Sequence, residues 1–230
     1  MNLPVKRRHP RNGLVQRLGK LIVGRFHRVY YQLAESVAGS HKRDFLVTRV
    51  EDARDGLEAT KDQFQTALDK FTDLVQVEEG NIAVFYKELK REFDHCEQKA
   101  QSVHNHIDTI ENLALALFDE WELELEQYTN RTLRGKSRQK LKLTQRHYKQ
   151  LIRAMRKAES RIDPVLNAFR DQVLYLKHNL NAQAIAALQH ELISVSVDIA
   201  SMIQVMERSI QQADQFMHTL DHRPALTAER

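Results

Sequence analysis

Apolar and small residues recur along this chain at alternating steps of four and three positions. The first run begins at Leu46 and continues through Val50, Ala53, Leu57, Thr60, Phe64, Ala67, Phe71 and Leu74. Later runs with the same spacing span residues 82–121, 141–169 and 185–206. A repeat of 3.5 residues is typical of helices whose apolar seams interlock with partner helices. The pattern therefore predicts long helices that pack in a bundle.

Breaks between the runs mark the expected helix ends. They predict helices over about 42–77, 82–128 and 182–221, and a further helix that starts near Arg138. A shorter amphipathic helix is expected at 14–37, ahead of a break at Gly39 and Ser40. Several stripes are wider than two positions per heptad, and a wide stripe needs more than one neighbouring helix.

Three short turns are expected between the long helices. Gly80 suits a left-handed C-cap in the first turn, and Ser137 suits an N-cap after the second turn, at 129–136. The third turn covers 179–181. Because short turns make consecutive helices antiparallel neighbours, the predicted fold class is all-α. It is an elongated antiparallel up-down-up-down four-helix coiled-coil bundle with an extra short N-terminal amphipathic helix.

The domain organisation follows from these elements. A basic tail and amphipathic helix are expected at 1–40, the long helical bundle at 41–222 and a flexible tail at 223–230. Pro164 lies within the third run without disturbing its phase, which favours a kinked helix. The alternative is that Asp163 caps a new helix with Pro164 at its first position.

Composition supports a helical chain that leaves much of its surface in water. Seven glycines and four prolines are too few for a strand-rich fold, which needs frequent turn residues. The hydrophobic fraction of 42% suits an elongated bundle better than a sphere. Cys96 is the only cysteine and falls on a seam, so it is interpreted as a buried structural thiol.

Charge is sorted by region although the formal net charge is only +4. Residues 1–34 carry eight bases and no acid, residues 78–128 carry thirteen acids and four bases, and residues 131–161 carry twelve bases and one acid. The acidic second helix and the basic third helix would neutralise each other if their charges met across a shared interface. The heptad positions favour a different arrangement, in which five bases point outward as a cationic ridge: Lys142, Arg146, Lys149, Arg153 and Arg156. Such a ridge suits an anionic partner.

The N-terminal segment has the pattern of a helix that lies in a membrane interface. Its predicted membrane-contact residues combine an apolar face with flanking bases: Leu14, Arg17, Leu18, Lys20, Leu21, Ile22, Arg25, Phe26, Arg28 and Val29. The longest uncharged apolar run is too short for a secretory signal or a membrane span. The competing interpretation is that this helix docks on the bundle as a fifth helix.

No pattern in the chain argues for an enzyme, a metal site or a cofactor. Glu97, His104, Asp108 and Glu111 share one stripe, but a solvated polar face is the simpler interpretation. Di-iron bundles need a Glu-x-x-His pair on two helices, whereas the chain has one, at 92–95. Phosphate-binding glycine loops are absent. We therefore expect neither catalytic residues, nor a resident metal, nor any cofactor.

Three stretches, at 41–55, 117–122 and 148–181, resemble an uncharacterised family of bacterial envelope coiled-coil proteins, known only as a domain of unknown function. The most specific match is Tyr-Leu-Lys-His-Asn-Leu-Asn at 175–181, because heptad spacing alone does not dictate it. The resemblance covers about 41–220 and implies a bacterial source, a helical fold and no assigned activity. Members usually begin with an export signal, often of lipoprotein type, and residues 1–40 show none.

The predicted function is a non-enzymatic helical scaffold or spacer that associates peripherally with a membrane and mediates protein or membrane-surface contacts. The expected partner is an anionic membrane surface or a protein, and homo-oligomers are left open. The alternative is a nucleic-acid-associated protein that binds through the cationic ridge, against which the ridge offers only Tyr148 for stacking. We expect the protein at the cell envelope, on the cytoplasmic face, with the periplasm as the location that the family resemblance implies.

Overall fold

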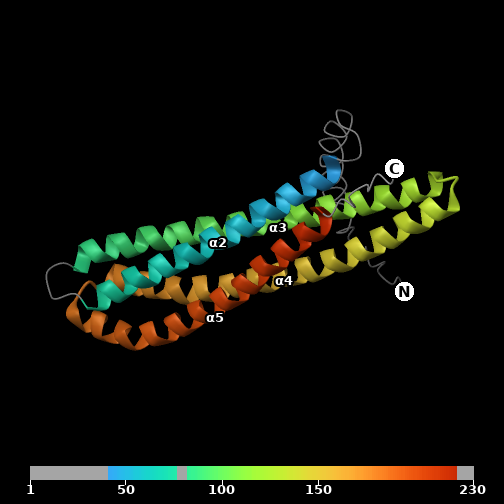
Figure 1. Ribbon diagram of the computed structural model, residues 1–230. Helices are drawn as coiled ribbons and strands as arrows, with labels where there is room; N and C mark the ends of the chain where they lie inside the picture. Colours follow the sequence, from blue (N-terminus) through green and yellow to red (C-terminus); the bar gives the residue numbers. More distant parts are fainter. Residues whose placement is uncertain (1–40, 77–81, 222–230) are drawn as a thin grey trace, which may run out of the picture. The chain divides into compact units, whose positions relative to one another are not determined.

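The computed structural model describes residues 41–76 and 82–221 of the chain. These residues form four long helices: α2 (His41–Val75), α3 (Ile82–Gln127), α4 (Arg131–His178) and α5 (Ala182–Asp221). Figure 1 shows them as an antiparallel bundle, in which α4 packs against both α3 and α5. The predicted class, all-α with four antiparallel helices, is confirmed. The predicted N-terminal helix, the Gly80 cap and the C-terminal tail lie outside the described residues.

The apolar runs form the core as their spacing predicted. Every position of the first run is buried, and Leu57, Phe64 and Phe71 are fully enclosed. In α3 the seam shifts by one residue near its end, where Phe118 is buried and Leu117 is only partly covered. The fourth run continues beyond its predicted end, through the buried Ser209, Ala213, Phe216 and Leu220.

Aromatic side chains connect the helices at two levels of the bundle. Phe169 of α4 lies 5.7 Å from Phe71 of α2 and 5.8 Å from Phe93 of α3, measured between ring centroids. At the other level, Tyr148 of α4 lies 5.3 Å from Phe118 of α3 and 6.5 Å from Phe216 of α5. The near-perpendicular pairs have the edge-to-face geometry that aromatic rings favour.

The connection between α3 and α4 is shorter than the sequence predicted. Asn130 is the N-cap of α4, and its Oδ1 accepts hydrogen bonds from the backbone N–H groups of Thr132 and Leu133 at 2.9 and 3.1 Å. The prediction that 129–136 forms a turn capped by Ser137 is therefore wrong. Gly135 suggested a break, but a glycine in an exposed helix costs only about 1 kcal/mol, which a good N-cap offsets.

Pro164 lies inside α4, which is continuous from Arg131 to His178. The alternative in which Asp163 caps a new helix is therefore wrong. Pro164 is exposed, so water can solvate the backbone carbonyl one turn earlier, which lacks its usual N–H partner. The apolar positions on either side, Ile162 and Val165, stay buried and keep the helix on the core.

Candidate anion-binding face

Helix α4 has a buried face and a cationic face in the region that the charge pattern singled out. Its buried side chains there are Leu141, Thr144, Tyr148, Leu151 and Met155. The opposite side carries four exposed bases, which we call the cationic row: Lys142, Arg146, Lys149 and Arg153. Their spacing of four, three and four residues places them along one face of the helix. The prediction that these four side chains point outward is confirmed.

The cationic row is a line of charge without counter-charges in the described part of the chain. None of its four members makes an ion pair with residues 41–76 or 82–221, whereas other bases of α4 do. From Lys142 to Arg153 the row extends about 16 Å along the helix axis. Neighbouring like charges at this spacing repel one another slightly. An anion bound across the row would relieve that repulsion, so the geometry favours an extended anionic partner.

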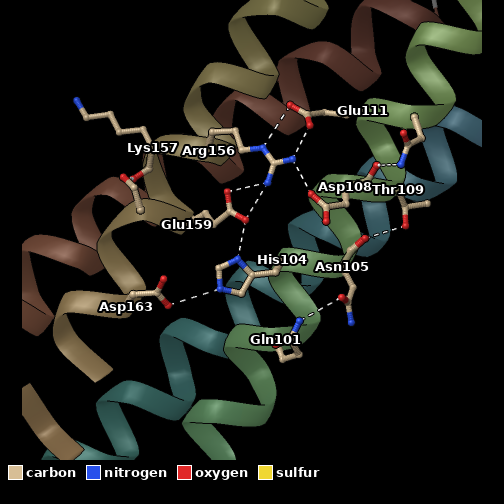
Figure 2. Close-up of polar contacts among 12 residues, drawn as sticks. Gln101, His104, Asn105, Asp108, Thr109, Glu111, Arg156, Lys157, Glu159 and Asp163 are labelled. Atoms are coloured by element: carbon tan, nitrogen blue, oxygen red, sulfur yellow. Dashed lines mark hydrogen bonds and ion pairs between the residues drawn. The ribbon is translucent and has the colours of Figure 1, made fainter. Parts of the chain in front are cut away.

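Arg156, the fifth predicted ridge residue, does not belong to the row. Its guanidinium points toward α3, where Nη2 donates to Asp108 at 2.6 Å and also to Glu111 (Figure 2). Nη1 donates to both carboxylate oxygens of Glu159 at 2.9 Å. The hydrogen bond to Glu111 and the bonds to the other two acids raise the pKa of Arg156. Its predicted outward position is therefore wrong, because the long side chain reaches back to the neighbouring helix.

His104 extends the same network on the α3 side. Its Nδ1 lies 2.6 Å from Oε1 of Glu159, and its Nε2 lies 3.6 Å from Asp163 (Figure 2). Glu97, on the same stripe, accepts from Arg170 of α4 at 2.6 Å. This stripe of α3 was interpreted as a solvated polar face, and the structure instead places bases and acids of α4 against it. No group of three or more potential metal ligands occurs among the described residues.

Further ion pairs join the ends of the same two helices. Arg134 lies 2.6 Å from Glu126, and Arg138 lies 3.9 Å from the same carboxylate. The acidic α3 and basic α4 thus neutralise each other in part, at Arg134, Arg138, Arg156 and Arg170. The four members of the cationic row make no ion pair within the described helices, and they are the unpaired bases that line up along the outward face.

A shallow depression of about 600 Å³ lies between α4 and the end of α5. It is lined by Lys136, Gln139, Lys140, Leu143, His218 and Thr219. Burial lowers the pKa of Lys140, and the nearby charge of Arg43 lowers it further. Two lysines in a hollow suit an anionic group, and the hollow lies on α4 just before the cationic row.

Two other predicted features have their places in the core. Cys96 is fully buried, and burial raises the pKa of its thiol to about 12. A thiol that stays protonated is a poor nucleophile, so the interpretation of Cys96 as a structural residue is confirmed. Tyr148 was taken as the aromatic of the ridge, but only 8% of it is exposed and burial raises the pKa of its hydroxyl to about 12. Tyr148 cannot stack on a nucleic-acid base from there.

The predicted membrane-contact residues have no counterpart in the described structure. Leu14, Arg17, Leu18, Lys20, Leu21, Ile22, Arg25, Phe26, Arg28 and Val29 all lie outside the described residues. Within the described helices, none combines the length and the apolar composition needed to cross a bilayer.

Four long antiparallel helices with a cationic row on one outward face place this chain in the class of helical-bundle proteins. Within that class, the chain belongs to the family described as "Protein of unknown function (DUF2959)", whose model matches residues 30–220. The match confirms the resemblance to a domain of unknown function. The family description says nothing of an envelope location or of lipoproteins. No match was found among curated proteins.

Proposed function

We propose that this protein is a non-enzymatic helical scaffold or spacer that attaches to an anionic membrane surface, with the cationic row as a contact. One observation carries the proposal: Lys142, Arg146, Lys149 and Arg153 are exposed in a line and have no acidic partner in the described helices. A pocket-bound small molecule would need a concave site, whereas a row along a rigid helix fits an extended or planar anion.

The strength of such a contact follows from membrane electrostatics. A Lys or Arg near an anionic bilayer contributes roughly 1 kcal/mol, and the effect falls off within a Debye length. Four bases on one helix face can approach a plane together, because the row covers only about three turns of the continuous helix α4. Together they would strengthen binding by tens to hundreds of fold at low salt, allowing for imperfect additivity.

The N-terminal segment would supply a second anchor. If this segment is helical, as its sequence predicts, Leu18 and Phe26 would share a face flanked by Arg17 and Arg25, a pattern suited to the headgroup boundary. Apolar insertion and charge attraction together give stable but reversible attachment, as two weak membrane signals do elsewhere. Such attachment would make the protein a peripheral component of the cell envelope, on the cytoplasmic face, and the rod of helices would hold other components at a distance.

Vesicle co-sedimentation of the full chain tests the proposal. We expect binding to vesicles with anionic lipid, weak binding to neutral vesicles, and loss of binding as salt rises. Changing all four members of the row to Gln should weaken binding to anionic vesicles at least tenfold. Equal binding to neutral and anionic vesicles, or binding to neither, would contradict it.

A matched control separates the row from overall charge. Lys87, Lys99, Lys177 and Arg208 are also exposed, make no ion pair with the described residues, and are scattered over three helices. Changing these four to Gln alters the net charge by the same amount. The control variant should keep most of its affinity. If it binds as weakly as the row variant, net charge and not the row is responsible.

Nucleic acid is the alternative anionic partner, and the same variants address it. The burial of Tyr148 removes the only aromatic that the ridge was expected to offer for base stacking. We therefore expect weak binding to duplex and single-stranded DNA at 150 mM salt. A tight complex with DNA that is lost in the row variant would replace the membrane by nucleic acid as the partner.

A further inference from the structure

Helix α5 carries a second heptad-spaced repeat on the side that faces away from the bundle, made of apolar and small residues at four of its six positions. Its inward seam is Leu188, Val195, Ile199, Met202 and Met206, all buried. The outward repeat has steps of four, three, four, three and four residues, and every member is exposed: Ala186, His190, Ile193, Val197, Ala200 and Gln204. Ile193 and Val197 are 68% and 62% exposed, among the highest values for large apolar side chains in the described helices. A helix that packs against a bundle through one face needs only one apolar seam, so the outward repeat of α5 is not needed for the fold.

The surface around this outward repeat is nearly free of charge. Between residues 182 and 206 only Glu191 and Asp198 are charged, although 29% of the whole chain is charged. Helical geometry places both acids to one side of the repeat, about 100° from Ile193 and Val197 or more. The flanking positions are small or uncharged: Ala187, Ser194 and Ser201 on one side, and Gln189, Ser196 and Ile203 on the other. Such a surface suits close helix packing and not solvation.

The chemistry of this face selects its partner. Its only charges are acidic, which disfavours an anionic membrane or a nucleic acid, whereas both acids lie too far around the helix from Ile193 and Val197 to meet across a helix pair. A second copy of the same face, by contrast, is complementary when it is laid antiparallel. The twofold axis then crosses the outward face midway between Ile193 and Val197, at the height of Val195 along the helix. Ile193 then meets Val197 of the second copy, His190 meets Ala200, and Ala186 meets Gln204. Each layer thus pairs an a position of one copy with a d position of the other, as in a coiled coil. The larger side chains of the outer layers, His190 and Gln204, face alanines.

We propose that α5 forms the twofold interface of a homodimer, in which the outward repeats of two copies pack antiparallel. The interface is isologous, so every favourable layer occurs twice. The repeat is about 27 Å long. An isolated helix pair of that length would be marginal, but α5 is already ordered by its inward seam, so association does not require folding. The proposal is independent of membrane attachment.

Hydrodynamic measurement of the full chain tests the dimer. Light scattering after size-exclusion chromatography should give twice the chain mass of 26.9 kDa at micromolar concentration. Ile193→Glu and Val197→Glu should each weaken association at least tenfold and yield monomer, with unchanged helix content. Leu115→Glu is the matched control, since Leu115 is 58% exposed on α3, and it should remain dimeric. A monomeric wild-type chain, or a dimer unaffected by both α5 variants, would overturn the proposal.

Cysteine cross-linking tests the axis itself. In the proposed packing Ser194 lies beside Ser194 of the second copy, whereas Ser201 lies beside Ala187. Ser194→Cys should therefore form an intermolecular disulfide under mild oxidation, and Ser201→Cys should not. The native Cys96 is buried and serves as an internal control without cross-linking. Equal cross-linking of both variants, or cross-linking of Ser201→Cys alone, would overturn the antiparallel register.

Discussion

The indole N–H of Trp121 on α3 donates a hydrogen bond to Oγ of Ser137 on α4, at 2.9 Å. Trp121 is only 6% exposed, and the guanidinium of Arg43 lies over its ring at 4.5 Å. Because a buried indole N–H needs an acceptor, this bond holds the first turns of α4 against α3. Ser137 therefore stabilises a contact between two helices and does not begin one.

Replacement of Ser137 by Ala should leave the Trp121 N–H without an acceptor. We expect a loss of about 1–2 kcal/mol in the free energy of unfolding and a shift in fluorescence, which Trp121 as the only tryptophan reports directly. Asn130→Ala is the comparison, because it removes the N-cap and should cost about 1 kcal/mol without changing the emission of Trp121. If Ser137→Ala and Asn130→Ala give the same emission spectrum of Trp121, the hydrogen bond to Ser137 does not form in solution.

Arg156→Met should destabilise the bundle more than the same change in its exposed neighbour Arg153. Arg156 neutralises Asp108, Glu111 and Glu159, and the Glu159 side chain is only 14% exposed. Removing the arginine should cost about 1–2 kcal/mol, since the charges are partly screened by solvent. Arg153→Met should stay within about 0.5 kcal/mol of the wild type. Chemical denaturation of both variants gives the comparison, and equal effects would count against the network.

The two glycines inside described helices should respond differently to Ala. A Cβ at Gly135 would meet no atom within 4 Å, so Gly135→Ala should stabilise the protein by about 0.5–1 kcal/mol. At Gly56 a Cβ would lie 3.1 Å from Nδ1 of His106, and that nitrogen is itself 3.0 Å from the carbonyl oxygen of Asp52. Gly56→Ala should therefore gain nothing or lose stability. Melting temperatures of the two variants test the difference.

Stability should fall in acid partly because of Glu92. Its carboxylate accepts a hydrogen bond from Gln63 at 2.9 Å and further bonds from Arg91, and these interactions hold its pKa below the ordinary value of 4.5. Since the folded pKa is the lower one, this stabilisation is complete above the ordinary pKa and is lost as the pH falls through the folded pKa.

Glu92→Gln should remove that part of the pH dependence. The difference in unfolding free energy between wild type and variant should be largest at pH 7. It should shrink as the pH falls below 4.5. Asp119→Asn is the control, because it makes the same change of acid to amide at an exposed position on the same helix. A constant difference between wild type and Glu92→Gln over the whole range would count against the prediction.

The seams of the four helices were predictable from spacing alone. Positions such as Leu57, Phe64 and Ile107 are buried because a 3.5-residue period puts them on one side of any straight helix, whatever surrounds it. Helix ends were predictable where turn residues coincide with the end of a run, as at 179–181. The start of α4 was not predictable, because the local composition of 129–136 resembles a turn and suggested Ser137 as the N-cap. Packing of Trp121 against Ser137 instead favours a helix that already includes these residues.

The partition of the bases of α4 was decided only by the tertiary structure. Lys142, Arg146, Lys149, Arg153 and Arg156 share the same pattern in the sequence, and local spacing cannot separate them. Arg156 turns inward because the register of α3 against α4 brings Asp108 and Glu111 within reach of its guanidinium, and the other four make no ion pair within the described helices. That register is set by how the buried side chains of two helices interlock, which is a property of the pair. The heptads thus determined that the chain forms a bundle, and the packing between helices determined which charges remain on its surface.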